Sequence, residues 1–257
     1  MKNGFSLVEL SIVLVILGLL TGGILGGQAL IRAAELRSVS ADFSRYQTAV
    51  MTFRDKYFAF PGDMANATAF WGTDSSGCPN GGGSIGTCNG DGDTTIDEAT
   101  NESFRFWQHL ALGGLIEGAY SGIAGAGSPY HTIPRLNSPA TRISNAGIFI
   151  RALPSQSGNT QWYDGNYPNH LMYGGVTTST VPSIPIFSPS EAWNIDVKAD
   201  DGLPGQGRLM VFSTNGWNNA GGTLARCTLS TSSADRGAGY ALGQDSSQCT
   251  FIYFVGI

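Results

Sequence analysis

The stretch that decides the fold is MKNGFSLVELSIVLVILGLL, residues 1–20, which continues as TGGILGGQALI through residue 31. No charged residue stands between Leu10 and Ile31. As a helix this run would span roughly 33 Å, which is enough to cross the hydrocarbon core of a bilayer. Glu9 stands at its start, and a carboxylate in hydrocarbon costs a few kcal/mol even on mild insertion scales. The sequence therefore predicts a membrane helix with one acid that needs a partner.

The composition of the chain indicates a globular protein with many turns. It has 257 residues, of which 36 are glycine, and only 13% are charged. The length allows one large domain or two small ones. The net charge of −5 comes without basic clusters, which argues against a nucleic-acid partner.

An ordinary secretory signal explains the N-terminus poorly. The apolar region of such a signal is shorter, and a small-residue cleavage site follows it. Lys2 precedes the apolar run here, whereas Arg32 and Arg37 follow it. The distribution of positive charge therefore gives no clean orientation in a membrane.

The segment GFSLVELSIVLVILGLL, residues 4–20, resembles the class III leader and anchor of type IV pilins and type II secretion pseudopilins. The shared features are a basic leader, a Gly-Phe pair, a glutamate at a fixed offset and a long apolar helix. The resemblance implies that a prepilin peptidase cuts between Gly4 and Phe5 and that Phe5 is then N-methylated. It also implies four parts of the chain: a leader (1–4), a transmembrane and filament-core helix (5–31), the amphipathic half of that helix (32–60) and a globular head (61–257).

The same resemblance implies a partner for Glu9. Cleavage leaves a charged amine on Phe5, and in the filaments of this family the glutamate of one subunit meets the N-terminal amine of a neighbour. Pairing relieves the cost of an isolated buried charge, so Glu9 would set the register of subunits during assembly. The alternative is an acid that reaches the membrane interface without a partner.

The helix is expected to continue into the head. Neither proline nor glycine interrupts the chain from Gln28 to Phe60, so one helix should run to about Pro61-Gly62. Apolar residues recur at alternating steps of three and four, which is typical of one buried stripe. This stripe comprises Leu36, Val39, Phe43, Tyr46, Val50, Phe53 and Tyr57.

The head should be of the α+β class, with an antiparallel sheet that follows the long helix. Residues 61–97 read as a loop, and a second helix is expected over about 100–112, before Gly113-Gly114. Ser188, Pro189 and Glu191 predict a capped third helix that ends before Gly202. Strands are expected from Gly147, His170, Arg208 and Cys249.

The four cysteines fall in two sequence-local pairs, which fits disulfides formed in an oxidising compartment. We predict the pairs Cys78–Cys88 and Cys227–Cys249, although four cysteines allow three connectivities. Many type IV pilins close a loop near the C-terminus with a disulfide, and the resemblance assigns this role to Cys227 and Cys249.

The strongest polar cluster is CNGDGDTTIDEATNES, residues 88–103, where oxygen-bearing side chains alternate with glycines, as a hard cation such as Ca²⁺ prefers. Counted from Asn89, Thr94 replaces the turn glycine of an EF-hand; counted from Asp91, Glu102 fits the last position but Ile96 replaces that glycine. The alternative is an acidic turn that caps the following helix. The candidate ligands for a structural Ca²⁺ are Asn89, Asp91, Asp93, Thr95, Asp97, Glu98 and Glu102.

The remaining sequence patterns are weaker indications of a functional site. GGGSIG, residues 81–86, matches nucleotide-binding and nucleophile motifs, but both need a strand before and a helix after, and this stretch lies in a loop. Turn formation explains a second acidic group, and the histidines lack metal-ligand spacing. Trp107 and Trp193 are expected in the core, whereas WYDGNYPNH, residues 162–170, is a candidate ligand surface. The acidic group is Asp196, Asp200 and Asp201, and the histidines are His109, His131 and His170.

The sequence therefore predicts a structural subunit of a type IV pilus or a type II secretion pseudopilus, not an enzyme. Its expected partners are other pilin-like subunits, a prepilin peptidase and an inner-membrane assembly platform. The chain would sit in the inner membrane as a single-pass protein with a periplasmic head, and later in a filament. The alternative is a membrane-tethered ligand-binding or hydrolytic head that uses the same anchor.

Overall fold

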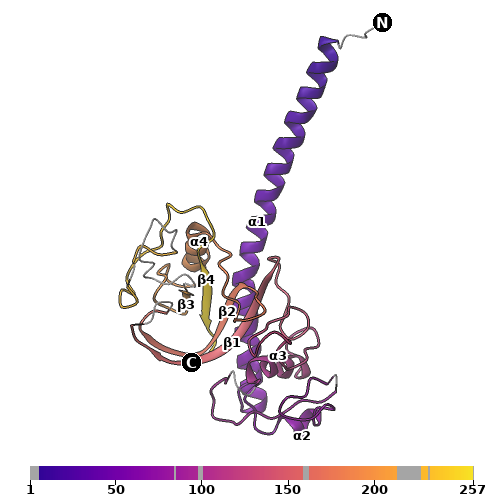
Figure 1. Ribbon diagram of the computed structural model, residues 1–257, viewed down its shortest axis with the longest axis vertical. Helices are drawn as coiled ribbons and strands as arrows, with labels where there is room; N and C mark the ends of the chain where they lie inside the picture. Colours follow the sequence, from indigo (N-terminus) through magenta and orange to yellow (C-terminus); the bar gives the residue numbers. More distant parts are fainter. Residues whose placement is uncertain are drawn as a thin grey trace.

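The computed structural model describes residues 6–83, 85–97, 101–158, 162–212, 227–230 and 232–256. One long helix, α1, projects out of a head that gathers around its C-terminal half (Figure 1). The head holds a sheet, three shorter helices and long connecting loops. The arrangement is the predicted α+β class, with a long N-terminal helix and an antiparallel sheet.

Helix α1 runs from Leu7 to Tyr57 without a break, and its second half continues as the absence of proline and glycine from Gln28 onward predicts. Ser6 caps its N-terminus. The helix ends at Phe58, which adopts the left-handed conformation (φ 53°) and donates its N–H to the Arg54 carbonyl. The end therefore comes a few residues before the predicted Pro61-Gly62, because Phe58 takes a conformation that glycine usually provides at this position.

The second half of α1 packs into the head through the predicted stripe. Its buried residues are Val39, Phe43, Tyr46, Ala49, Val50 and Phe53.

The sheet has four antiparallel strands in the order β1-β2-β4-β3. All four predicted strands are present, and the first two are longer than expected. The bounds are β1 Ala146–Gln156, β2 Gly165–Gly175, β3 Leu209–Phe212 and β4 Thr250–Phe254.

Aromatic rings join α1 to the sheet. Phe43 stacks on Tyr253 of β4 with ring centroids 4.6 Å apart, and it meets Tyr173 of β2 edge-on at 5.8 Å. On another side of α1, Tyr46 contacts Trp107 at 5.0 Å. Such pairs bury large apolar area in fixed geometry, so they set how the head is seated on the helix.

The three shorter helices are α2 Ala67–Trp71, α3 Glu102–Leu112 and α4 Pro189–Ala199. Helix α4 has the predicted capping box between Ser188 and Glu191. Helix α2 was not predicted, since its region was expected to be a loop. Trp107 is buried, as predicted. The prediction that Trp193 lies in the core is wrong, because Trp193 is 39% exposed on α4.

Candidate functional site

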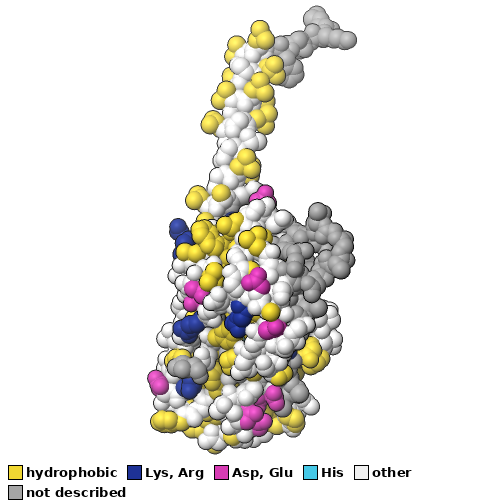
Figure 2. Space-filling view, turned by 90° about the vertical axis from the view of Figure 1, so that its left-hand side faces the viewer, with side chains coloured by type: hydrophobic (Ala, Val, Ile, Leu, Met, Phe, Trp, Pro, Cys, Tyr) yellow, Lys and Arg dark blue, Asp and Glu magenta, His cyan; other side chains and the backbone are white. Residues whose placement is uncertain are grey.

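The N-terminal half of α1 is an apolar surface that no part of the head covers. Large hydrophobic side chains between Leu7 and Ile31 are at least half exposed almost throughout (Figure 2). By length and composition, α1 is the one candidate for a membrane span among the described residues. A soluble monomer rarely exposes so continuous an apolar surface, so this surface belongs in lipid or against other helices.

Glu9 is held at the start of this apolar surface by its own helix. Its Oε2 accepts a hydrogen bond from the Ser6 amide at 2.9 Å, and the Ser6 hydroxyl accepts one from the Val8 amide at 3.3 Å. This arrangement is a capping box, which satisfies backbone donors that a helix start leaves open. The Ser-x-x-Glu spacing of Ser6 and Glu9 is a sequence signal for this cap. Gly4 and Phe5, the predicted processing residues, lie outside the described residues.

A family model described as the prokaryotic N-terminal methylation motif matches residues 1–25. The chain therefore carries the leader motif of type IV pilins and pseudopilins, which confirms the resemblance. Together with the exposed apolar helix, the motif supports a type IV pilin- or pseudopilin-like precursor. Such a leader implies processing by a prepilin peptidase and assembly into filaments. No curated protein and no solved structure matches the chain.

The head contacts α1 through Arg32, the first charged residue after the uncharged run. The Arg32 guanidinium donates from Nε to Glu191 Oε1 at 2.7 Å and from Nη2 to Glu191 Oε2 at 2.8 Å. It also donates to the Ile186 carbonyl at 2.8 Å. Glu191 in turn accepts the Ser188 amide at 2.9 Å, so one carboxylate both caps α4 and binds α1.

The described part of the calcium region brings together Asp91 and Glu102, and adds Asp63 to them. A carboxylate oxygen of each lies within 4.8 Å of the others. Asp63 and Glu102 are buried, at 2% and 1% exposure, and Asp91 is exposed. Sequence reasoning missed Asp63, because it lies in a distant loop segment and no local pattern links it to Glu102.

The other predicted ligands do not join this cluster. Asn89 accepts the Thr68 amide in the first turn of α2 at 2.8 Å, and Asp93 accepts the Thr95 amide of its own turn at 2.6 Å. Asp97 is not part of the carboxylate cluster, and Glu98 lies outside the described residues. Among the described acidic residues of this region, the group that could hold a hard cation is Asp63, Asp91 and Glu102.

Backbone amides hold these carboxylates in place. Asp63 accepts the Gly92 and Thr94 amides at 2.7 and 2.8 Å, and Glu102 accepts the Asp97 amide at 2.8 Å. Burial raises the pKa of Glu102 to about 7 and that of Asp63 to about 6, although these amides lower both. Neighbouring carboxylates raise the two pKa values further. A proton or a cation would relieve this crowding of negative charge.

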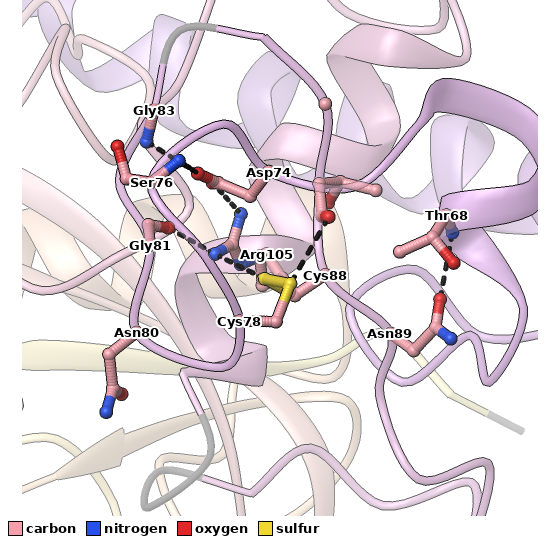
Figure 3. The surroundings of a disulfide bond; sticks show 12 residues. Thr68, Asp74, Ser76, Cys78, Asn80, Gly81, Gly83, Cys88, Asn89 and Arg105 are labelled. Carbon is pink, nitrogen blue, oxygen red and sulfur yellow. Dashed lines mark hydrogen bonds and ion pairs between the residues drawn. A yellow bond between two sulfur atoms is a disulfide. The ribbon is translucent and has the colours of Figure 1, made fainter.

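Both predicted disulfides are present, Cys78–Cys88 and Cys227–Cys249. The first closes a loop around the buried Arg105 of α3 (Figure 3). Arg105 pairs with Asp74 at 3.1 Å, donates to Gln108 Oε1 at 2.7 Å and contacts the Cys88 sulfur at 3.1 Å. It also donates to the Gly81 carbonyl.

Asp74 completes this network from the loop side. Its Oδ1 accepts the Ser76 and Gly83 amides at 2.8 and 3.0 Å. Although burial alone would raise the pKa of Asp74, these amides and the Arg105 guanidinium together lower it. The GGGSIG stretch therefore wraps a structural ion pair, and its Ser84 lies outside the described residues.

Two of the three histidines, His109 and His170, are buried in the head. His109 is buried, accepts the Gly62 amide at 2.9 Å on Nδ1, and meets the Thr87 hydroxyl at 3.0 Å on Nε2. His170 is also buried, with Nδ1 at 2.8 Å from the Pro168 carbonyl. Burial lowers the pKa of both to about 3, so both rings stay neutral. His109 is a packing residue, as predicted.

Proposed function

We propose that this protein is a structural subunit of a type IV pilus or of a type II secretion pseudopilus. The observation that carries the proposal is the methylation motif at residues 1–25, placed on a helix whose first half has no partner in its own head. An uncovered apolar helix packs against the same helix of neighbouring subunits once it leaves the lipid.

The proposed partners are a prepilin peptidase, an inner-membrane assembly platform and further pilin-like subunits. Before assembly, residues 5–31 cross the inner membrane once and the head lies in the periplasm. The two disulfides support an oxidising compartment for the head.

The proposal treats the chain as a non-enzyme. The rival is a membrane-tethered ligand-binding or hydrolytic head, and a groove of about 1080 Å³ where α1 ends favours a ligand. Tyr167 and Leu153 line this groove, but Trp162, which begins the candidate ligand surface, is only 5% exposed. A groove alone names no reaction, so the filament subunit is the stronger proposal.

Two experiments test the proposal. N-terminal sequencing of the mature protein should begin at Phe5 with an N-methyl group, and Gly4→Leu should leave the precursor unprocessed. Electron microscopy of sheared cell-surface or periplasmic material should show fibres that contain the protein. A tethered head without fibres, or an intact Met1, would contradict the proposal.

We propose in addition that Asp63, Asp91 and Glu102 bind a structural Ca²⁺. Their shared position, the burial of two of them and the raised pKa values support a cation there. A bound cation would tie α3 to the loops that carry Asp63 and Asp91.

A further inference from the structure

A separate group of carboxylates lies where α4 ends. Asp196 is in the last turn of α4, Asp200 is its C-cap residue and Asp201 opens the next loop. One oxygen of each carboxylate lies within 4.8 Å of the others. Turn formation explains part of this grouping, because Asp201 Oδ1 accepts the Leu203 amide at 2.8 Å.

Turn formation does not explain Asp196. This residue is fully buried, and its Oδ1 accepts no hydrogen bond. Its other oxygen, Oδ2, accepts the Tyr240 hydroxyl at 2.7 Å. A buried carboxylate oxygen without a donor is costly and calls for a partner.

No basic side chain of the described residues supplies that partner. The ion pairs found there involve other carboxylates. Arg208 lies over the Tyr253 ring, 5.5 Å from its centroid, and Arg236 donates to the Gly205 carbonyl at 2.7 Å. The negative charge at the end of α4 is therefore left without a counter-charge.

The remaining contacts fix the other two carboxylates and leave oxygens for a ligand. Asp200 Oδ2 accepts the Leu209 amide at 2.9 Å and also the Arg208 amide. Gly207, at φ 70°, brings the backbone against both side chains: a Cβ there would lie 3.0 Å from Asp201 Oδ2. Within the described part of the chain, no hydrogen bond reaches Asp200 Oδ1 or Asp201 Oδ2.

We propose that Asp196, Asp200 and Asp201 form a binding site for a hard divalent cation such as Ca²⁺. Asp196 Oδ1, which has no hydrogen-bond donor, would coordinate the cation. The cation would then link Asp196 to the loop that leads into β3. The site is also connected to the C-terminal segment, because Asp196 binds the Tyr240 hydroxyl. The next residue, Ala241, donates its amide to the Cys227 carbonyl at 3.0 Å. Carboxylate oxygens gathered on a turn suit Ca²⁺.

A proton on Asp196 is the competing explanation. Burial raises the pKa of Asp196 to about 7, and the charges of Asp200 and Asp201 raise it further. The Tyr240 hydroxyl and the nearby Gly202 amide lower it in part. A protonated Asp196 would relieve the charge but would still need an acceptor for its O–H. A cation site binds added Ca²⁺, whereas a site neutralised by a proton on Asp196 does not. A titration with Ca²⁺ therefore separates the two explanations.

The test uses full-length protein in detergent, freed of metal with a chelator and titrated with Ca²⁺ by calorimetry. An Asp91→Asn background weakens the other acidic cluster, so the outcome does not depend on that site. In this background we expect Ca²⁺ to bind, and Asp201→Asn to weaken binding at least tenfold. Asp201 is exposed, and asparagine keeps the acceptor for the Leu203 amide, so the fold should survive. Asp245→Asn removes an exposed acid outside the group and should leave the affinity unchanged.

Thermal unfolding at pH 8 provides the second readout. Ca²⁺ should raise the melting temperature of the Asp91→Asn protein and of its Asp245→Asn derivative, and raise that of the Asp201→Asn derivative much less. The inference is overturned if the Asp91→Asn protein binds no Ca²⁺, or if Asp201→Asn and Asp245→Asn bind it equally. Stabilisation by lower pH without any Ca²⁺ effect would assign a proton to Asp196 and would also overturn it.

Discussion

Arg32 and Glu191, 159 residues apart in the sequence, form a two-point ion pair that joins the long helix to the head. Arg32 is the first charged residue after the apolar run, so the pair marks where the free part of α1 begins. Against the effect of its burial, the Arg32 guanidinium and the Ser188 amide lower the pKa of Glu191. The same carboxylate caps α4, which couples the seating of the head to the integrity of that helix.

We predict that Arg32→Ala lowers the free energy of unfolding of the head by about 1–2 kcal/mol. A planar two-point pair is stronger than a single surface contact, but both side chains are partly exposed, at 32% and 22%, so solvent screens them. Chemical denaturation of the detergent-solubilised protein, followed by tryptophan fluorescence, measures the change.

A double-variant cycle isolates this pair. Glu191→Gln keeps a capping residue at α4 and removes only the charge, so Arg32→Ala should cost little more in that background. Arg54→Ala is the matched control, because Arg54 is an exposed α1 arginine without an ion pair in the described residues. Equal losses from Arg32→Ala and Arg54→Ala would contradict the role of the pair.

Glu9 is predicted to act in assembly through its charge and not through its cap. Glu9→Gln retains a capping partner for Ser6 but cannot neutralise an N-terminal amine. We expect normal leader cleavage with filament yield reduced at least tenfold, measured by immunoblotting of sheared fractions.

Ser6→Ala is the complementary variant, since it removes the hydroxyl of the cap and keeps the Glu9 charge. It should assemble far better than Glu9→Gln. Wild-type filament yield from Glu9→Gln would rule out the charge-pairing role.

The acidic cluster at Glu102 should make stability depend on pH when metal is removed. The pKa of Glu102 is raised from 4.5 to about 7 in the folded protein, so at pH 6.5 the folded state holds a proton that the unfolded state has lost. This stability is present at low pH and disappears as pH rises through about 7. Between about pH 5 and 7, chelated protein should lose stability with a slope of up to about 1.4 kcal/mol per pH unit, and the slope should fade above pH 7, where Glu102 is ionised in both states. Thermal melts across this range measure it.

Calcium should flatten this dependence and raise the melting temperature at pH 8, since the cation replaces the proton. Asp91→Asn should weaken the Ca²⁺ effect, whereas Asp93→Asn should not, because Asp93 is an adjacent exposed acid outside the cluster. Identical behaviour of the two variants would count against this cluster as a cation site.

The buried pair of Arg105 and Asp74 should be costly to break from one side. Both side chains are at most 2% exposed, so Arg105→Met would leave an uncompensated charge and destabilise the head by about 3–5 kcal/mol. Adding Asp74→Asn removes that charge and keeps an acceptor for the Ser76 and Gly83 amides. The double variant should therefore be more stable than Arg105→Met in urea denaturation; a further loss would show that the pair is not the source of the effect.

Much of the fold could be predicted because its signals are local. The capped start of α4 depends on residues three apart, Ser188 and Glu191, and the buried stripe of α1 depends on helical spacing. Two features escaped because no local pattern marks them: the short α2, and the helix end at Phe58, where a non-glycine residue takes φ 53°.

The calcium region shows the limit more sharply. The sequence has a run of oxygen-bearing side chains, yet Asn89 binds the start of α2 and Asp93 binds its own turn. Asp63 comes from a separate loop to join Asp91 and Glu102. Spacing alone could not separate a ring of ligands from a set of turn-forming side chains, because both use the same residue types.

By itself, the sequence determined the processing motif, the long apolar helix, the order of the strands and of the helices other than α2, and the sequence-local grouping of the cysteines. These features depend on residues that are close together in the chain, so their chemistry can be read in order. Only the tertiary structure decided which charges meet: Arg32 with Glu191, Arg105 with Asp74, and Asp196 with no basic partner at all among the described residues. The physical reason is that burial and long-range packing, not spacing, set the partners and the pKa values of these groups.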